Sequence, residues 1–301
     1  MNSADDEILN HIKSVELLIL KDFIKICDDN DIDYFLFFGT EIGAVRHHGF
    51  IPWDDDVDVI MHRADYERFI DVAKEELDER FFLQTLGTDK DFYHAITRIR
   101  ANNTTAIICD EWEEQFPYHQ GVFFDIFPID SVPDNKWVMK LHRFCIKLLN
   151  SIARSSVVNL KLDKKYSLLH RVSFRFFRVI TLFIKPLKIA KLRDRLAQKY
   201  NNINTKRIGL ISQLYGFENA IWDRKLFEET IEVPFEYLMI TVPKEYDSVL
   251  TKIYGDWRTP MRVDDIDNNS FMHSGTFFDT EKSYEYYLPE YEKYKNIPNN
   301  L

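Results

Sequence analysis

The feature that most constrains this chain is a group of four aspartates set against the start of an apolar run. The acids are Asp54, Asp55, Asp56 and Asp58, and the run covers residues 57–61. Because side chains alternate along a strand, the even-numbered acids would share one face, and Val57 and Val59 would face the core. Carboxylates on one face raise one another's pKa, and a divalent cation such as Mg²⁺ relieves their repulsion. The pattern therefore predicts a strand over 54–61 that presents a metal site to a phosphate-bearing substrate.

An alternative is that this acidic run is a solvated surface loop, as short runs of aspartate often are. Here the acids stand between Trp53 and an apolar run. Charges at the mouth of a core strand cost free energy unless they have a use. This context favours the metal site over the loop.

The pair Gly39-Thr40 is a candidate phosphate seat. It closes an apolar stretch, and Thr40 is expected to cap a short helix that reaches His47. Backbone amides at a helix N-terminus favour anions, and glycine permits a close approach of the backbone. Such a pair is also common as an ordinary helix cap. It indicates a phosphate site here only because an acidic strand follows it.

Asp125 is the next candidate acid, because it stands inside the otherwise apolar stretch 122–127. A carboxylate buried without a partner costs several kcal/mol. We therefore expect Asp125 to lie on a strand beside the 54–61 strand and to complete the cation site. The alternative is that Asp125 caps a turn or pairs with Arg98 or Arg100.

The rest of the chain predicts alternating helices and strands. Apolar residues three or four apart predict helices over 8–29 and 64–79, and Pro128 is expected to end the strand that begins at 121. The other expected strands are 32–38, 81–85, 94–100, 104–109, 231–234 and 237–242, and a helix is expected over 244–254. We expect a single α+β domain over 1–301, with a mixed sheet core flanked by helices and a basic helical subdomain inserted at 136–200.

Composition narrows the setting of the protein. The 301 residues are 45% hydrophobic, which suffices for a sizeable core. The cysteines, Cys27, Cys109 and Cys145, are too far apart to suggest a disulfide framework or a zinc cluster. The N-terminal residues lack the pattern of a signal peptide, and no apolar run is long enough to span a membrane. We expect a cytoplasmic protein.

Charge is divided unevenly along the chain. Residues 136–200 contain 17 Lys or Arg and two acidic residues, a net charge of +15, which leaves −25 for the remainder. Within 166–199 the basic residues alternate with aromatic and aliphatic ones, a pattern that suits an anionic membrane surface. Nucleic-acid binding is a weaker explanation, and a solvated helical hairpin packed on the acidic core is the plain alternative. We expect membrane contact at the inner face and no nucleic acid.

The order of these motifs resembles the nucleotidyltransferase fold, and more narrowly the LicD family, to which fukutin and fukutin-related protein belong. The resemblance rests mainly on the block Gly39-Thr-Glu-Ile-Gly-Ala-Val-Arg-His-His-Gly-Phe-Ile-Pro-Trp-Asp-Asp-Asp-Val-Asp-Val59. Residues 63–69, 124–130 and 254–257 are similar to later blocks of that family. In two respects the chain departs from relatives: Glu41 stands where many have a neutral residue, and the Cys-rich zinc element of some animal members is not evident.

The resemblance implies a nucleotidyltransferase-like core and a metal-dependent transferase. It implies Asp56, Asp58 and Asp125 as ligands of Mg²⁺, or of Mn²⁺, with Asp54 as a ligand or a supporting acid. Family members transfer a phosphate-linked group, such as phosphocholine or ribitol phosphate, from a CDP-activated donor to a glycan. We therefore expect a CDP-linked donor and a glycan or lipid-linked glycan acceptor.

Further residues are candidates for binding and proton transfer. Arg46 could hold the pyrophosphate, because a guanidinium fork matches phosphate oxygens. His47, His48 and His273 are candidate bases, as is Asp125, although a lone histidine is more often structural. His47 and Trp53 are also expected to contact the substrate. Trp53 stands next to the acids, and a choline head group would call for aromatic side chains around it. With 39 Phe and Tyr in addition to the tryptophans, the sequence does not select them.

The function expected from these features is transfer of a phosphate-linked group to a hydroxyl of a cell-surface glycan precursor, with release of CMP. Phosphocholine is the first choice of transferred group. One alternative is a nucleotidyltransferase that moves NMP to a small molecule and releases pyrophosphate. Another is a non-catalytic protein that uses its basic helices to bind membrane or RNA.

Overall fold

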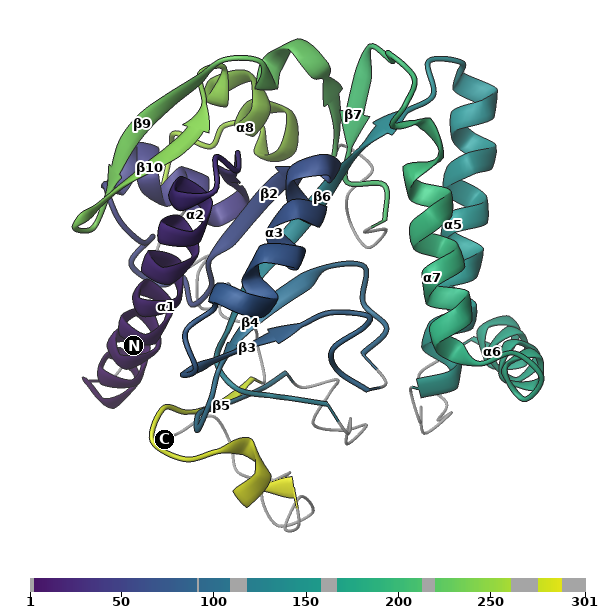
Figure 1. Ribbon diagram of the computed structural model, residues 1–301, viewed down its shortest axis with the longest axis horizontal. Coiled ribbons are helices and arrows are strands. Elements are labelled where there is room, and N and C mark those ends of the chain that lie inside the picture. The colour runs from purple at the N-terminus through teal and green to yellow at the C-terminus, as the bar shows by residue number, and fades with distance from the viewer. Residues whose placement is uncertain are drawn as a thin grey trace.

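The computed structural model describes residues 3–90, 92–108, 118–157, 167–212, 220–260 and 276–288 (Figure 1). Its helices are α1 (Ser3–Asp29), α2 (Phe38–Ile42), α3 (Arg63–Glu76), α5 (Lys136–Val157), α6 (Leu168–Thr181), α7 (Pro186–Ala197) and α8 (Tyr246–Tyr254). A π-helical turn, Gly43–His47, continues α2, and short 3-10 turns occupy Gln198–Tyr200, Arg224–Phe227 and Tyr284–Tyr286.

The strands are β1 (Phe35–Leu36), β2 (Asp58–His62), β3 (Phe81–Gln84), β4 (Thr97–Ala101), β5 (Thr105–Ile107), β6 (Phe123–Val132), β7 (Arg207–Gly209), β8 (Ile221–Asp223), β9 (Thr230–Phe235), β10 (Leu238–Pro243) and β11 (Phe277–Asp279). The main sheet runs β1-β2-β6-β4-β3, and β7 and β8 extend it along the second half of β6. Only the β2–β6 pair is parallel among the described ladders of this sheet. The α+β class with a mixed sheet is confirmed, and its nucleotidyltransferase-like detail stays a prediction.

The two faces of the sheet have different partners, which determines where the acids lie. On one face, Val59 of β2 packs with apolar side chains of α1 and α3. On the other face, Ile60 and Phe127 pack in a second core that includes α8. Because side chains alternate along a strand, Asp58 and Asp125 lie on this second face. The sheet thus carries both carboxylates on the side that α1 and α3 do not cover.

Two strand predictions need correction. The strand expected over 54–61 begins only at Asp58, so the three preceding acids lie in the loop before β2. Pro128 does not end β6, which continues to Val132. The amide of Asp125 donates to the carbonyl of Val57, on the β2 side of the strand. Because backbone groups alternate in direction along a strand, the nitrogen of residue 128 faces the opposite side, toward β4. Pairing of β6 with β4 has already ended at Ile126. A proline is tolerated there because no ladder hydrogen bond is lost.

The cap expected at Thr40 is also wrong, because the helix begins at Phe38 with Phe37 as its N-cap. Phe38 has a φ of 48°, an unusual value for a bulky residue. Its ring packs against Phe37 and Phe127 at centroid distances of 4.6 and 5.6 Å. These contacts offset the strain of a sharp turn that carries the chain from β1 directly into α2.

The basic segment forms the helices α5, α6 and α7 between the adjacent strands β6 and β7, and α7 begins at Pro186. In Figure 1, α5 and α7 stand side by side at one edge of the molecule, and α6 lies across one end of the pair. None of the helices in the described ranges has both the length and the apolar character that crossing a bilayer requires.

A buried ion network joins this helical layer to the sheet. Arg63, the first residue of α3, donates two hydrogen bonds of 2.9 and 2.7 Å to the carboxylate of Asp130 on β6. It also donates to Asp194 of α7 at 3.0 Å, and Asn201 donates to Asp130 at 2.7 Å. Arg63 and Asp130 belong to two of the blocks that carried the family resemblance, so part of that resemblance is structural.

Candidate active site

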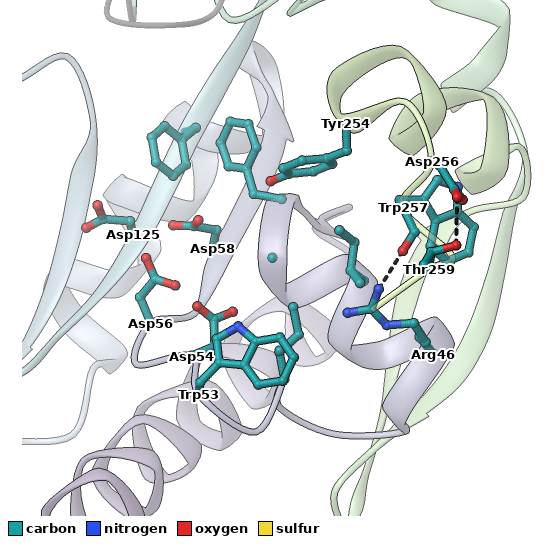
Figure 2. Close-up of a pocket in the computed structure, with 15 residues that line it drawn as sticks. Arg46, Trp53, Asp54, Asp56, Asp58, Asp125, Tyr254, Asp256, Trp257 and Thr259 are labelled. Atoms are coloured by element: carbon teal, nitrogen blue, oxygen red, sulfur yellow. Dashed lines mark hydrogen bonds between the residues drawn. The ribbon is translucent and has the colours of Figure 1, made fainter. Parts of the chain in front are cut away.

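A cavity of about 520 Å³ opens on the acid-bearing face of the sheet (Figure 2). Its walls come from α2 and the following turn, the loop 51–56, the strands β2 and β6, and the segment 254–259 at the end of α8. The carboxylates of Asp54, Asp56, Asp58 and Asp125 all line it. The structure therefore brings together the four acids that were singled out as metal ligands.

Asp58 and Asp125 stand directly opposite each other in the parallel β2–β6 ladder. Burial raises the pKa of Asp58 well above its ordinary range, and the charges of Asp56 and Asp125 raise it further. Arg98, on the neighbouring strand β4, donates from Nε to Oδ1 of Asp125 at 2.8 Å. The expected position of Asp125 beside the acidic strand is confirmed, and so is the alternative that it pairs with Arg98. Its role as a metal ligand stays a prediction.

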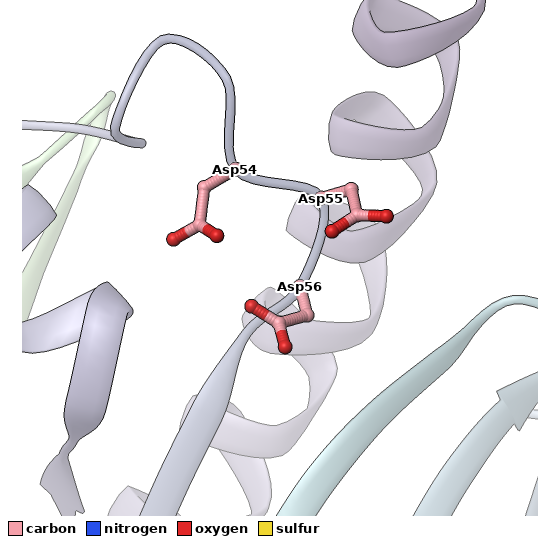
Figure 3. Close-up of side chains that lie close together, drawn as sticks. All are labelled: Asp54, Asp55 and Asp56. Atoms are coloured by element: carbon pink, nitrogen blue, oxygen red, sulfur yellow. The ribbon is translucent and has the colours of Figure 1, made fainter. Parts of the chain in front are cut away.

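The side chains of the three loop acids, Asp54, Asp55 and Asp56, point in two different directions (Figure 3). Among the described residues, Asp54, Asp55 and Asp56 can each offer a carboxylate oxygen within 4.8 Å of the others. Asp54 and Asp56 line the cavity, whereas Asp55 is 2% exposed and turns toward the neighbouring helix. Asp55 is therefore a natural internal comparison for the acids that face the cavity.

Gly39 lies against the side chain of Asp54, a contact that the sequence did not reveal. A Cβ there would lie 2.6 Å from Oδ2 of Asp54. The space beside the Gly39 backbone, which was expected to accept a phosphate, is occupied in this structure by the carboxylate of Asp54. Gly39 still lines the cavity, so its predicted contact with substrate remains a prediction.

Hydrogen bonds from helix α1 hold the loop that carries Trp53 and Asp54. Lys13 of α1 donates from Nζ to the carbonyls of Ile51 and Pro52 at 3.1 and 2.9 Å. The amide of Asp54 donates to the Ile51 carbonyl at 3.0 Å. The indole of Trp53 lines the cavity and packs in an apolar cluster with Trp257. These bonds hold the acids in place without using their carboxylates.

Three residues proposed to bind substrate occupy different positions. Arg46 lines the cavity and donates to the carbonyl of Trp257 at 2.5 Å. His47 does not line it, and its Nε2 accepts a bond of 3.0 Å from Nε of Arg46, so it orients the guanidinium. Thr40 is buried in α2, where its Oγ1 accepts from the amide of Asp58 at 2.8 Å. His273 lies outside the described residues.

Glu41, the departure noted from relatives, does not face the cavity. Its side chain is fully buried, and neither carboxyl oxygen has a hydrogen-bond partner among the described groups. Burial raises the pKa of Glu41 well above its ordinary value. Burial thus disfavours the charged form of this carboxyl, which does not line the cavity.

The wall opposite the acids was missed by the sequence analysis. Tyr254, Asp256, Trp257 and Thr259 line the cavity, although they are some 200 residues from the acidic loop. Helix α8 ends at Tyr254, and the residue that follows it, Gly255, has a φ of 72°. The indole Nε1 of Trp257 donates to Asp247 at 3.1 Å, which folds the segment back onto α8. The signal that could have found this wall was the block 254–257, recognised but given no role.

Five aromatic side chains also line the cavity. They are Phe38, Trp53, Phe127, Tyr254 and Trp257. Carboxylate oxygens alone suit a hard cation such as Mg²⁺ or Mn²⁺ better than zinc, which favours nitrogen and sulfur. Aromatic faces attract an organic cation. The site therefore combines a region fit for a metal-bound phosphate with a region fit for an apolar or cationic group.

Comparison with known proteins identifies the family to which the chain belongs. The family model described as LicD/FKTN/FKRP, nucleotidyltransferase domain, matches residues 31–146, which include Asp54, Asp56, Asp58 and Asp125. The chain belongs to the LicD family. It is 33% identical over 252 residues, 80% of its own length and 88% of the relative's, to the lipopolysaccharide cholinephosphotransferase LicD of Haemophilus influenzae. An uncharacterised protein of Rickettsia typhi is 30% identical over 134 residues, 42% of this chain and 38% of that protein. The resemblance to the LicD family inferred from the sequence is thus confirmed.

Proposed function

We propose that this protein transfers a phosphate-linked group, phosphocholine first among the candidates, from a CDP-activated donor to a hydroxyl of a cell-surface glycan precursor. The observation that carries the proposal is the cavity itself, whose lining combines the carboxylates of Asp54, Asp56, Asp58 and Asp125 with five aromatic side chains. Its volume of about 520 Å³ is in the range of small-molecule sites. The named activity of the Haemophilus relative agrees with this choice of group.

Asp56, Asp58 and Asp125 are the residues that would hold Mg²⁺ or Mn²⁺, with Asp54 as a further ligand or a support. When bound, the cation would neutralise the charge of the donor pyrophosphate and of the departing CMP. Arg46 lies on the cavity wall and is oriented by Trp257 and His47, so it would bind the donor phosphates. The ion pair with Arg98 holds the Asp125 side chain in place on β6.

In the proposed reaction, an acceptor hydroxyl attacks the phosphorus that carries the transferred group. A new P–O bond forms to the acceptor, the P–O bond to CMP breaks, and the hydroxyl proton passes to a base. Asp125 and His273 are the candidate bases. Positioning and charge stabilisation supply most of the catalysis in reactions of this kind.

The aromatic wall gives the proposal its specificity. A quaternary ammonium ion cannot form ordinary hydrogen bonds, and it binds over the faces of aromatic rings. Phe127 of β6 and Phe38 of α2 pack against each other in the lining, and Tyr254 and Trp257 come from the α8 side. A choline group between them would leave its phosphate on the side of the carboxylates. We place the reaction in the cytoplasm, with an acceptor at the inner membrane face.

The first test is to incubate the purified protein with Mg²⁺ and a panel of CDP-choline, CDP-ribitol and CDP-glycerol, with and without lipid-linked glycan, and to measure CMP. The proposal requires CMP release with one donor, stimulation by glycan and loss on addition of EDTA. Absence of CMP with every donor would count against it. Release of pyrophosphate from CTP in the presence of a small acceptor would instead support NMP transfer.

A further inference from the structure

Exposed apolar side chains of this protein gather on one part of its surface. Twenty-one large hydrophobic residues are exposed in the described ranges, and fifteen of them lie between Trp137 and Leu192, on α5, α6, α7 and their connections. Contiguous apolar surface of this kind marks an interaction site more often than it marks ordinary solvent-facing surface. The active-site cavity uses none of these helices, so the patch needs its own explanation.

Helix α6 has the clearest pattern. Leu169, Val172, Phe176 and Val179 recur every three or four residues, and they are 77, 54, 62 and 52% exposed. They therefore form one stripe along the helix, on the side that is not packed. The turn that follows extends the stripe with Phe183, which is 84% exposed. Packing of α6 uses a different side, where Phe174 is buried.

A second stripe lies on α5, which packs against α6. Trp137, Leu141, Phe144 and Leu148 follow the same spacing and are 78, 63, 62 and 36% exposed. An isolated exposed leucine needs no explanation, but two stripes on adjoining helices do.

The charges beside these stripes have one sign. Arg175 of α6 follows Val172 by three residues and precedes Val179 by four, a spacing that places it next to the apolar stripe. Arg178 is exposed one row further round the helix, and Lys185 and Lys188 continue the basic series into α7. Within the described part of this segment the acidic residue is Asp194, and it bonds to Arg63. The layer therefore presents positive charge around an apolar face.

We infer that α6 and the turn after it dock the protein on an anionic lipid bilayer, with the apolar stripe in the interface and the basic residues at the headgroups. Helices with an apolar stripe and a basic flank bind such surfaces. A second copy of this chain would bring the same positive charge against the face, which disfavours a symmetric dimer. Nucleic acid would pair with the arginines and leave leucine, valine and phenylalanine exposed to water. The inference does not depend on the reaction proposed above.

The test is co-sedimentation of the full chain with vesicles of phosphatidylcholine alone and with vesicles that also contain phosphatidylglycerol. We expect binding only to the anionic vesicles, and weaker binding as salt is raised. Two double variants probe the face: Phe176→Ser with Phe183→Ser, and Arg175→Glu with Arg178→Glu. Each is expected to lower vesicle affinity by at least about tenfold, because apolar insertion and headgroup attraction both contribute.

Matched controls change the same residue types elsewhere on the surface. Tyr237→Ser with Met239→Ser removes exposed apolar side chains from the β9–β10 hairpin, and Lys21→Glu with Lys225→Glu reverses exposed charges outside the basic segment. Both controls should bind vesicles like the unmodified protein. Equal loss in the controls, or no loss in the α6 variants, would overturn the inference.

The oligomeric state in solution provides an independent check. A monomer in sedimentation velocity, together with vesicle binding, supports docking on lipid. A dimer that Phe176→Ser with Phe183→Ser dissociates would show that a second copy covers this face, and the inference would fall. CMP release measured with a soluble acceptor separates this test from the catalytic proposal, since the α6 variants should retain it.

Discussion

At the scale of single residues, the chemistry depends on which carboxylates face the cavity. Asp58 and Asp125 meet because β2 and β6 are parallel neighbours in a fixed register, and Asp54 and Asp56 join them from a loop that Lys13 holds. The acids could be selected from the sequence because they interrupt apolar runs. Their division into cavity-facing and helix-facing groups could not, because it depends on how the loop turns before β2.

The first prediction compares acids of different orientation. Asp58→Asn and Asp125→Asn should each lower turnover by at least about a hundredfold, because they remove charge from the proposed cation site. Asp55→Asn, which changes an acid that does not line the cavity, should retain most activity. Steady-state CMP release at saturating donor, with circular dichroism to confirm folding, measures this. Equal loss in all three variants would contradict the assignment.

The aromatic wall leads to a second prediction, about donor choice. Tyr254→Leu should raise KM for CDP-choline by about tenfold, because it removes one π face from the cationic group. KM for CDP-glycerol, which has no quaternary ammonium, should change little. Tyr237→Leu, an exposed tyrosine outside the cavity, is the control. A parallel rise for both donors would mean that Tyr254 does not read the head group.

Glu41 leads to a prediction about stability. Its buried carboxyl has no hydrogen-bond partner in the described structure, so Glu41→Leu should stabilise the fold by about 1–3 kcal/mol at neutral pH. The folded-state pKa is raised, so the wild-type protein loses stability as pH rises above the ordinary pKa of Glu. The gain should therefore grow from acidic to neutral pH in urea unfolding. A gain that shrinks over that range would indicate an ionised and well-solvated Glu41.

At the scale of elements, two features of β6 could be read only from its neighbours. Pro128 suggests the end of a strand, yet β6 continues because the proline falls between the pairing regions of β4 and β7. Asp130, near the end of the same strand, pairs with Arg63 at the start of α3. Local propensity indicates where strands and helices exist, but strand ends and ion pairs depend on partners distant in sequence.

The Arg63 network gives an element-scale prediction. Arg63→Met should destabilise the protein by about 3–5 kcal/mol, because it leaves the fully buried carboxylate of Asp130 without its main partner. Since Arg63 also bonds to Asp194, α7 should become more accessible to protease. Arg68→Met, which removes an exposed arginine from the same helix, should cost less than about 1 kcal/mol. Similar unfolding curves for the two variants would refute the role given to the network.

At the scale of the whole molecule, the chain divides into an acidic α+β body and a basic helical layer. The division of charge was visible in the sequence, where 136–200 carries +15. The exposure of its apolar stripes was not, because an amphipathic helix can equally turn that face inward. In the structure, the apolar stripe of α6 is exposed.

Acid stability gives a prediction at this scale, because His119 links distant parts of the chain. Its Nδ1 accepts from the amide of Gly121, and its ring packs between Phe82 of β3 and Tyr284 near the C-terminal end of the described chain. Burial, with the charge of Arg100, lowers the pKa of His119 to about 3. The unfolded state therefore binds more protons between that value and the ordinary pKa of about 6.5, and stability falls as pH is lowered through this window.

The measurement is urea unfolding near pH 7 and near pH 5. From this histidine alone the wild-type protein should lose about 2 kcal/mol between the two conditions. His119→Asn keeps an acceptor for Gly121 and removes the titrating group, so its loss should be smaller by about that amount. The burial of His94 acts in the same direction and leaves some pH dependence in the variant. An unchanged slope would show that folding does not lower the pKa of His119.

The sequence by itself determined the acids, the helices with strong periodicity, the family and the basic segment, because each of these is encoded in a short stretch of chain. Tertiary structure alone decided that 254–259 forms the far wall of the cavity, that Asp55 turns away from it, and that Arg63 meets Asp130. The physical reason is that burial of apolar surface and pairing of strands act between segments far apart in sequence, and no local pattern specifies which segments meet. The acids of the site are thus a property of one loop and two strands, whereas the cavity around them is a property of the whole fold.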